Sequence, residues 1–273
     1  MHKLTHPLAG VATGLAAIAS IAGLVVPGLY VDAPNWVQQA RGTDLATLLF
    51  AVPVLAVGLW AAARGSVRGR LAVMAGLLYL VYNYAIFAFS VAMNPLTAVH
   101  IAIFGLSLWS LVLAGPGGVQ EGTVSDKLNR RTAGAVLIIV GALFGLLWLG
   151  QIAGTSATGV LPPDLIKAGI STNPVYALDL AFFLPLCVVA GIGLIRGTRA
   201  AGLAFPMLIW VALMGAGVVS GFLVMAAAGD TIPAPIVAVI SILIVVSSLL
   251  AARAVFGSNA VRASAPTSRG LAT

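Results

Sequence analysis

The stretch from Asn173 to Pro185, NPVYALDLAFFLP, opens an apolar segment that continues to Ile195. The run from Val175 to Ile195 is long enough to cross the hydrocarbon core of a membrane as a helix, which takes about 20 residues. One acid, Asp179, lies about a turn and a half inside this run, where a charge is costly. The stretch therefore predicts a membrane helix and makes Asp179 its leading functional candidate.

The composition of the whole chain also indicates a membrane protein. Of 273 residues, 60% are hydrophobic and only 8% are charged, whereas an ordinary soluble domain carries about 25% charged residues. The formal net charge is +7, but the Lys and Arg residues fall between apolar runs. They are typical of orientation signals in a membrane protein and do not indicate binding of nucleic acid.

Eight apolar runs of about 20 residues predict an all-α fold with eight transmembrane helices. The runs cover residues 8–30, 45–63, 70–92, 95–114, 133–153, 176–195, 201–228 and 234–256. If the N-terminus is cytoplasmic, only Arg41 and Lys167 of the 14 Lys and Arg residues fall outside. The positive-inside rule then predicts a plasma-membrane protein with both termini in the cytoplasm.

The glycine-rich segment after the fourth run predicts a division into two four-helix halves. The expected boundaries are 1–115 for the first half, 116–131 for a cytoplasmic linker, 132–257 for the second half and 258–273 for a disordered cytoplasmic tail. Residues 132 positions apart match weakly, for example Pro53 with Pro185 and Arg64 with Arg196. The match favours a parallel 4+4 internal repeat, an arrangement found in some transporters.

Polar side chains from five predicted helices fall in the half of the membrane nearest the outside. In the third helix, Asn83 lies between Tyr82 and Tyr84, deeper than residues of an interfacial aromatic belt. Its amide both donates and accepts hydrogen bonds, which suits a polar ligand group or an acid such as Asp179. We therefore predict a ligand pocket in the outer leaflet, centred on Asp179 and formed by Asp179, Asn83, Tyr82, Tyr176, His100 and Asp44.

Each acid has a structural alternative to a role in binding. Asp44 is predicted at the start of the second helix, where a carboxylate caps free N–H groups and can pair with Arg41. For Asp179 the alternative is a hydrogen bond to Tyr or Asn on a neighbouring helix. Short amphipathic pieces at 35–39 and 163–167 are predicted to be interfacial helices at the outer ends of the bundle.

His100 is the only histidine within a predicted membrane helix, and a lone imidazole is more often a packing residue than a ligand. The other two histidines, His2 and His6, are predicted on the opposite side of the membrane, so haem ligation by two histidines of one chain is excluded. No metal-binding motif of the HExxH type occurs. The sequence indicates no metal and no particular cofactor.

Three classes of function remain open at this point. The first is binding or transport of a small polar or amphiphilic solute, with Asp179 as a proton-coupling group or as the counter-charge of a cationic ligand. The second is an intramembrane enzyme acting on a lipid or isoprenoid, with Asp179 and His100 as acid and base. The third is a non-catalytic membrane subunit or sensor. Membrane lipid and the small ligand are the expected partners, and an oligomer is compatible with all three.

Overall fold

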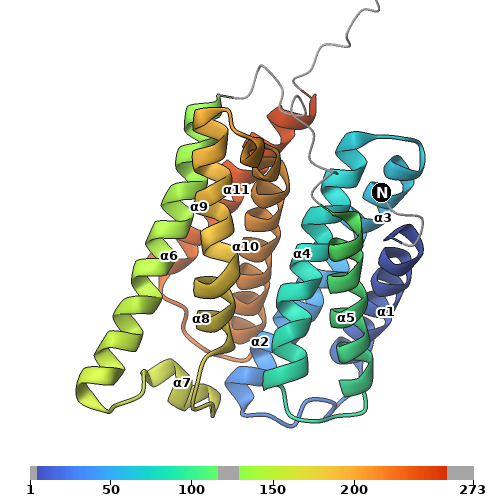
Figure 1. Cartoon of the computed structure of the whole chain (residues 1–273). Coiled ribbons are helices and arrows are strands. Elements are labelled where there is room, and N and C mark those ends of the chain that lie inside the picture. The colour runs from blue at the N-terminus through green and yellow to red at the C-terminus, as the bar shows by residue number, and fades with distance from the viewer. Residues whose placement is uncertain (1–4, 116–128, 257–273) are drawn as a thin grey trace, which may run out of the picture.

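The computed structural model describes residues 5–115 and 129–256, and this part of the chain is helical with no strand (Figure 1). Before the gap lie α1 (Thr5–Val25), α2 (Pro34–Ala46), α3 (Val52–Ala63), α4 (Val67–Ser90) and α5 (Thr97–Ala114). After it lie α6 (Arg130–Thr158), α7 (Pro163–Ala168), α8 (Pro174–Leu178), α9 (Leu184–Arg196), α10 (Ala204–Ala227) and α11 (Ala234–Phe256). Most of the predicted linker at 116–131 and the whole predicted tail at 258–273 fall outside the described residues.

Eight helices of the described chain are long and apolar enough to cross a membrane, which confirms the all-α, eight-helix prediction. They are Thr5–Val25, Pro34–Ala63, Val67–Ser90, Thr97–Ala114, Arg130–Thr158, Pro174–Arg196, Arg199–Ala227 and Ala234–Arg253. The first span begins and the last span ends at the same end of the bundle (Figure 1).

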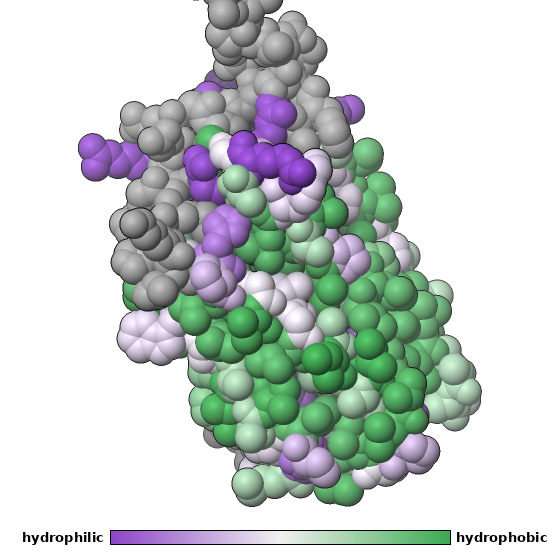
Figure 2. Space-filling view, turned by 90° about the vertical axis from the view of Figure 1, so that its right-hand side faces the viewer, coloured by the Kyte–Doolittle hydropathy of each residue, from purple (hydrophilic) through white to green (hydrophobic). Residues whose placement is uncertain are grey.

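The surface of the bundle is apolar between its two ends. Large side chains such as Trp60, Trp109 and Phe182 are each 60% exposed. Figure 2 shows an apolar face of this kind, with hydrophilic side chains gathered toward one end. A surface this apolar suits contact with lipid rather than water.

The two ends of the bundle differ in charge. The α3–α4 and α9–α10 connections lie at one end, which we call the arginine end because it carries Arg64, Arg68, Arg70, Arg196 and Arg199 (Figure 1). The opposite end, which we call the loop end, carries α7 and the connections that follow α1, α4 and α10 (Figure 1).

The second and sixth spans each contain a short π-helical segment that the sequence analysis did not predict. The segments are Thr47–Ala51 and Asp179–Phe183, and each lies just before a proline, Pro53 or Pro185. Proline lacks an N–H group and its ring clashes with the carbonyl of the preceding turn, so the helix widens there. In each case the residue before the proline donates its N–H to the carbonyl five residues back.

The two parts of the chain meet where α10 packs against α2 and α4. Gly42 of α2 lies directly against Gly221 of α10, because a Cβ atom on Gly42 would overlap the backbone of Gly221. Elsewhere α5 packs between α1 and α4, and α6 packs along α9.

The second span starts earlier than predicted, and this changes the position of Asp44. Its helix begins at Pro34 rather than at residue 45 and runs without a break to Ala63. The predicted separate interfacial helix at 35–39 is therefore wrong, since those residues form the first turns of the span. Asp44 is the eleventh residue of α2, so the prediction that it caps a helix start is also wrong. The short helix predicted at 163–167 is present as α7.

Candidate functional site

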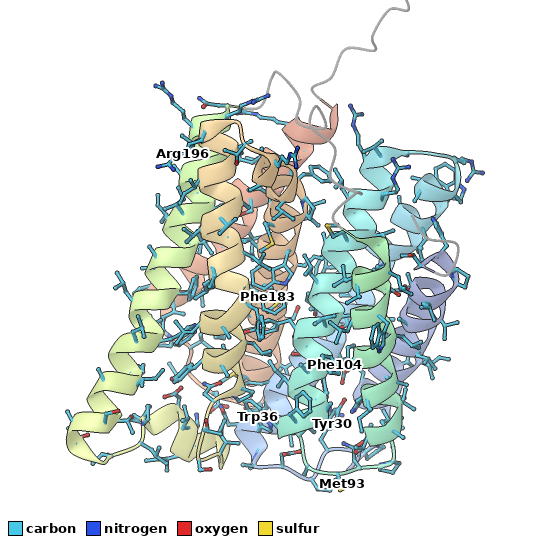
Figure 3. All side chains as sticks on the ribbon, viewed as in Figure 1. Tyr30, Trp36, Met93, Phe104, Phe183 and Arg196 are labelled. Atoms are coloured by element: carbon cyan, nitrogen blue, oxygen red, sulfur yellow. The ribbon has the colours of Figure 1, made fainter. Side chains whose placement is uncertain are left out.

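A cavity of about 530 Å³ lies at the loop end, bounded mainly by α2, α4 and α10. Residues of α7 and α8 and of the α10–α11 connection complete its rim. The volume lies within the range of about 300–1,000 Å³ that is usual for small-molecule sites. Trp36, which lines this cavity, lies near the loop end, whereas Phe183 lies midway along the bundle and Arg196 at the arginine end (Figure 3).

Two predicted site residues, Tyr82 and Asn83, line this cavity from α4. Both side chains are more than nine-tenths buried. The Asn83 Nδ2 donates to the Tyr79 carbonyl at 3.0 Å and lies 3.7 Å from the sulfur of Met214. The Tyr82 ring packs edge-on against Phe183, with ring centroids 5.0 Å apart. These two residues form part of the inner wall of the cavity.

The sequence analysis predicted that Asp179 lines the pocket. In the structure Asp179 is instead buried behind the wall formed by Tyr82 and Asn83. The carboxylate oxygen Oδ2 accepts a hydrogen bond of 2.7 Å from Trp148 Nε1 on α6. The hydroxyl of Tyr82 faces the same carboxyl group. Tyr82 thus contacts both the cavity and Asp179, and it is the link between them.

Tyr176, also predicted in the site, belongs to the same cluster. Its ring stacks on Trp148 with centroids 4.7 Å apart. Its hydroxyl is buried and has no hydrogen-bond partner among the described residues, and the same holds for Trp210 Nε1, whose ring stacks on Phe183. The environment of Asp179 is thus built of aromatic rings with spare hydrogen-bond donors.

Asp44 lies in a separate buried cluster against α1. It is 1% exposed, and its Oδ2 accepts a hydrogen bond of 2.7 Å from the hydroxyl of Tyr30. Burial, and then the neighbouring Asp44, raise the pKa of Tyr30 above its ordinary value, so Tyr30 keeps the proton that it donates. The guanidinium of Arg41 instead donates to the Leu24 carbonyl at 3.1 Å. The predicted pairing of Arg41 with Asp44 is therefore wrong.

His100 lies in the aromatic packing between α4 and α5 and does not line the cavity. Its ring is 1% exposed and packs against Phe87 and Tyr84, with centroid distances of 4.7 and 5.7 Å. Neither imidazole nitrogen has a hydrogen-bond partner among the described residues. The structure therefore does not join His100 to Asp179 as an acid and base would require.

Several cavity residues were missed by the sequence analysis. The cavity is lined from α2 by Asn35, Gln39 and Thr43. Their four-residue spacing indicates one polar helix face, but a search for apolar runs does not detect it. At the rim, Lys167 of α7 pairs with Asp230 of the α10–α11 connection at 3.1 Å. No group of three or more His, Cys, Asp or Glu side chains within residues 5–115 and 129–256 is placed to hold a metal ion.

Comparison of the chain with protein-family models, curated proteins and solved structures found no significant match. The function must therefore be argued from the cavity and its surroundings.

Proposed function

We propose that the protein binds a small polar or amphiphilic solute in the loop-end cavity and moves it across the plasma membrane. The observation that carries this proposal is a cavity of about 530 Å³ with a buried carboxylate behind one of its wall residues. A buried intramembrane acid usually marks a functional site, because leaving it there is costly.

The loop end is proposed to face outward, with both termini in the cytoplasm. The support is the clustering of arginines at the opposite end of the bundle. In this orientation the cavity lies in the outer leaflet, and a solute would enter it from the extracytoplasmic side.

The internal repeat is also proposed, and the π segments support it. Their first residues, Thr47 and Asp179, are 132 positions apart, the same offset that aligns Pro53 with Pro185. A widened turn before a proline is a place where a helix can bend. Two such turns at equivalent depths would let the two halves rock about the cavity, as alternating access requires.

Asp179 is proposed to couple protons to transport or to balance the charge of a cationic ligand. In the described structure its carboxyl is held by Trp148 and faced by Tyr82. A ligand or a proton that reached Tyr82 from the cavity would disturb this arrangement directly. The enzyme alternative is less well supported, because His100 has no polar contact with Asp179.

Binding can be tested by filling the cavity. A Cβ atom on Gly221, which lines the cavity, meets nothing within 4 Å, so Gly221→Leu places its side chain into open space. Gly150→Leu on α6 is the matched control, because Gly150 also has open space but lines no part of the cavity. Proteins purified in nanodiscs from native membranes would be extracted and the extracts compared by mass spectrometry.

We expect a compound that is enriched with the unmodified protein and with Gly150→Leu, and lost with Gly221→Leu. Equal extracts from all three proteins would contradict binding in this cavity.

Transport can be tested with Asp179→Asn and the compound so recovered. A proton-coupled transporter would lose pH-dependent uptake into proteoliposomes and keep exchange of ligand across the membrane. A scaffold or sensor subunit would lose only stability or assembly, and that result would refute transport.

A further inference from the structure

The two long walls of the cavity differ in chemistry, and we propose that its ligand is an uncharged amphiphile whose hydroxyl groups lie along α2 and whose apolar part lies along α10. This inference rests on the proposed function and names the class of ligand that the same cavity would take.

The α2 wall carries three polar side chains beside Trp36 and Ala40, and it carries no charge. Asn35, Gln39 and Thr43 are spaced by four residues, so they share one helix face over about 12 Å. Gln39 Nε2 donates to Asn35 Oδ1 at 2.8 Å. This bond leaves the Asn35 amide nitrogen and the Gln39 carbonyl oxygen without partners among the described residues. The wall therefore offers both donors and acceptors to a ligand.

Asn83 adds an amide from α4. It is 7% exposed, and its hydrogen bonds within the described chain use only the nitrogen Nδ2. Its side-chain oxygen is therefore left to accept from a ligand. A hydroxyl group both donates and accepts, which fits neighbouring amide groups better than a purely donating or purely accepting group.

The α10 wall is apolar along its whole length. It is formed by Met214, Gly217, Val218, Gly221, Phe222 and Met225. A Cβ atom on Gly221 meets nothing within 4 Å, so the wall is open enough to accept a chain or ring beside it. Apolar surface buried there stabilises binding by about 25 cal/mol for each Å².

The charges at the cavity argue against a charged ligand, so of the two roles proposed for Asp179 an uncharged ligand leaves proton coupling. Among the described residues that line it, the charged side chains are Asp164 and Lys167, which have opposite signs and lie at the rim. Lys167 is already paired with Asp230. A cationic or anionic head group against α2 would lose hydration without gaining a counter-charge there.

The test compares three probes that share an eight-carbon chain: octyl glucoside, octyl sulfate and octyltrimethylammonium. Each is labelled and dialysed to equilibrium, below its micellar concentration, against nanodiscs that hold the full chain. Empty nanodiscs correct for partition into lipid, and Gly221→Leu nanodiscs correct for binding outside the cavity. Asn83→Leu and Gln39→Leu remove one polar group each, and Gln39 is exposed at the cavity, so its variant is the safer one to fold.

We expect octyl glucoside to bind saturably and at least tenfold more tightly than either charged probe. Asn83→Leu or Gln39→Leu should weaken that binding about two- to tenfold, the usual effect of losing one hydrogen bond. Tighter binding of a charged probe that Gly221→Leu still abolishes would overturn the ligand class while leaving cavity binding intact. Unchanged affinity in both polar variants would overturn the assignment of the walls. No saturable binding that depends on Gly221 would refute the proposed function itself.

Discussion

Gly42 and Gly221 touch each other, yet we expect substitution by alanine to affect protein stability differently at the two positions. A Cβ atom on Gly42 would overlap the Gly221 backbone, which belongs to another helix and cannot rotate away. A Cβ atom on Gly221 meets nothing within 4 Å. Gly42→Ala must therefore push α2 away from α10, whereas Gly221→Ala need not move either helix.

The size of the effect follows from the kind of clash. Inserting a methyl group into a packed interface costs typically about 1–3 kcal/mol, and the upper part of that range applies here because the opposing atoms are backbone. We expect Gly42→Ala to lower the free energy of unfolding by about 2–3 kcal/mol and Gly221→Ala to change it by less than about 1 kcal/mol.

The assay is reversible unfolding in mixed micelles with a rising fraction of denaturing detergent, followed by circular dichroism. Because α2 and α10 both line the cavity, Gly42→Ala should also alter binding of octyl glucoside. Equal losses of stability in the two variants, or a larger loss for Gly221→Ala, would refute this account of how the helices meet.

Three further predictions concern the buried clusters and the rim. Gly23→Ala should destabilise the protein by about 1–3 kcal/mol, because its Cβ would overlap Asp44 and lie 2.6 Å from the Tyr30 hydroxyl. Gly14→Ala is the control and should not destabilise the protein, because Gly14 has open space around it. The two unfolding curves should therefore differ, and coinciding curves would contradict the packing of Asp44 on α1. His100→Phe keeps the ring contacts and removes two unpartnered nitrogens. Thermal denaturation should therefore show equal or greater stability. Loss of ligand binding in this variant would instead give the imidazole a role at the site. Lys167→Met breaks an exposed ion pair and should change the free energy of unfolding by less than about 1 kcal/mol. A larger change would indicate that the rim of the cavity stabilises the fold.

The helices could be predicted from the sequence because crossing a membrane imposes a length of apolar chain that is visible in any window. The same reasoning placed the second helix too late. Asn35 and Gln39 lower the hydropathy of its first turns, yet the helix continues through them because Pro34 suits a helix start and the polar side chains line the cavity.

Asn83 could be singled out from the sequence because it lies between two tyrosines and deeper than an interfacial belt residue, and it lines the cavity together with Tyr82. The neighbours of Asp179 could not be predicted from the sequence. Its partners Trp148 and Tyr82 come from two other helices, and periodicity within one helix does not say which helices are adjacent. For the same reason Asp44 and His100 could be recognised as buried but not assigned to separate clusters.

The π segments show a further limit of prediction from sequence. Pro53 and Pro185 mark where a helical hydrogen bond is lost, but a proline can be accommodated by a kink, a break or a wider turn. The choice depends on the packing around each proline, which the sequence does not state. The 132-residue spacing of the two prolines is visible in the sequence, but the wider turn before each of them is not.

The most direct test is an experimental density map of the protein in nanodiscs prepared from native membranes. The account predicts non-protein density between α2, α4 and α10, in contact with Asn83 and Tyr82, and its loss in Gly221→Leu but not in Gly150→Leu. A cavity filled by the protein's own side chains, or ligand density only at a different place, would contradict it.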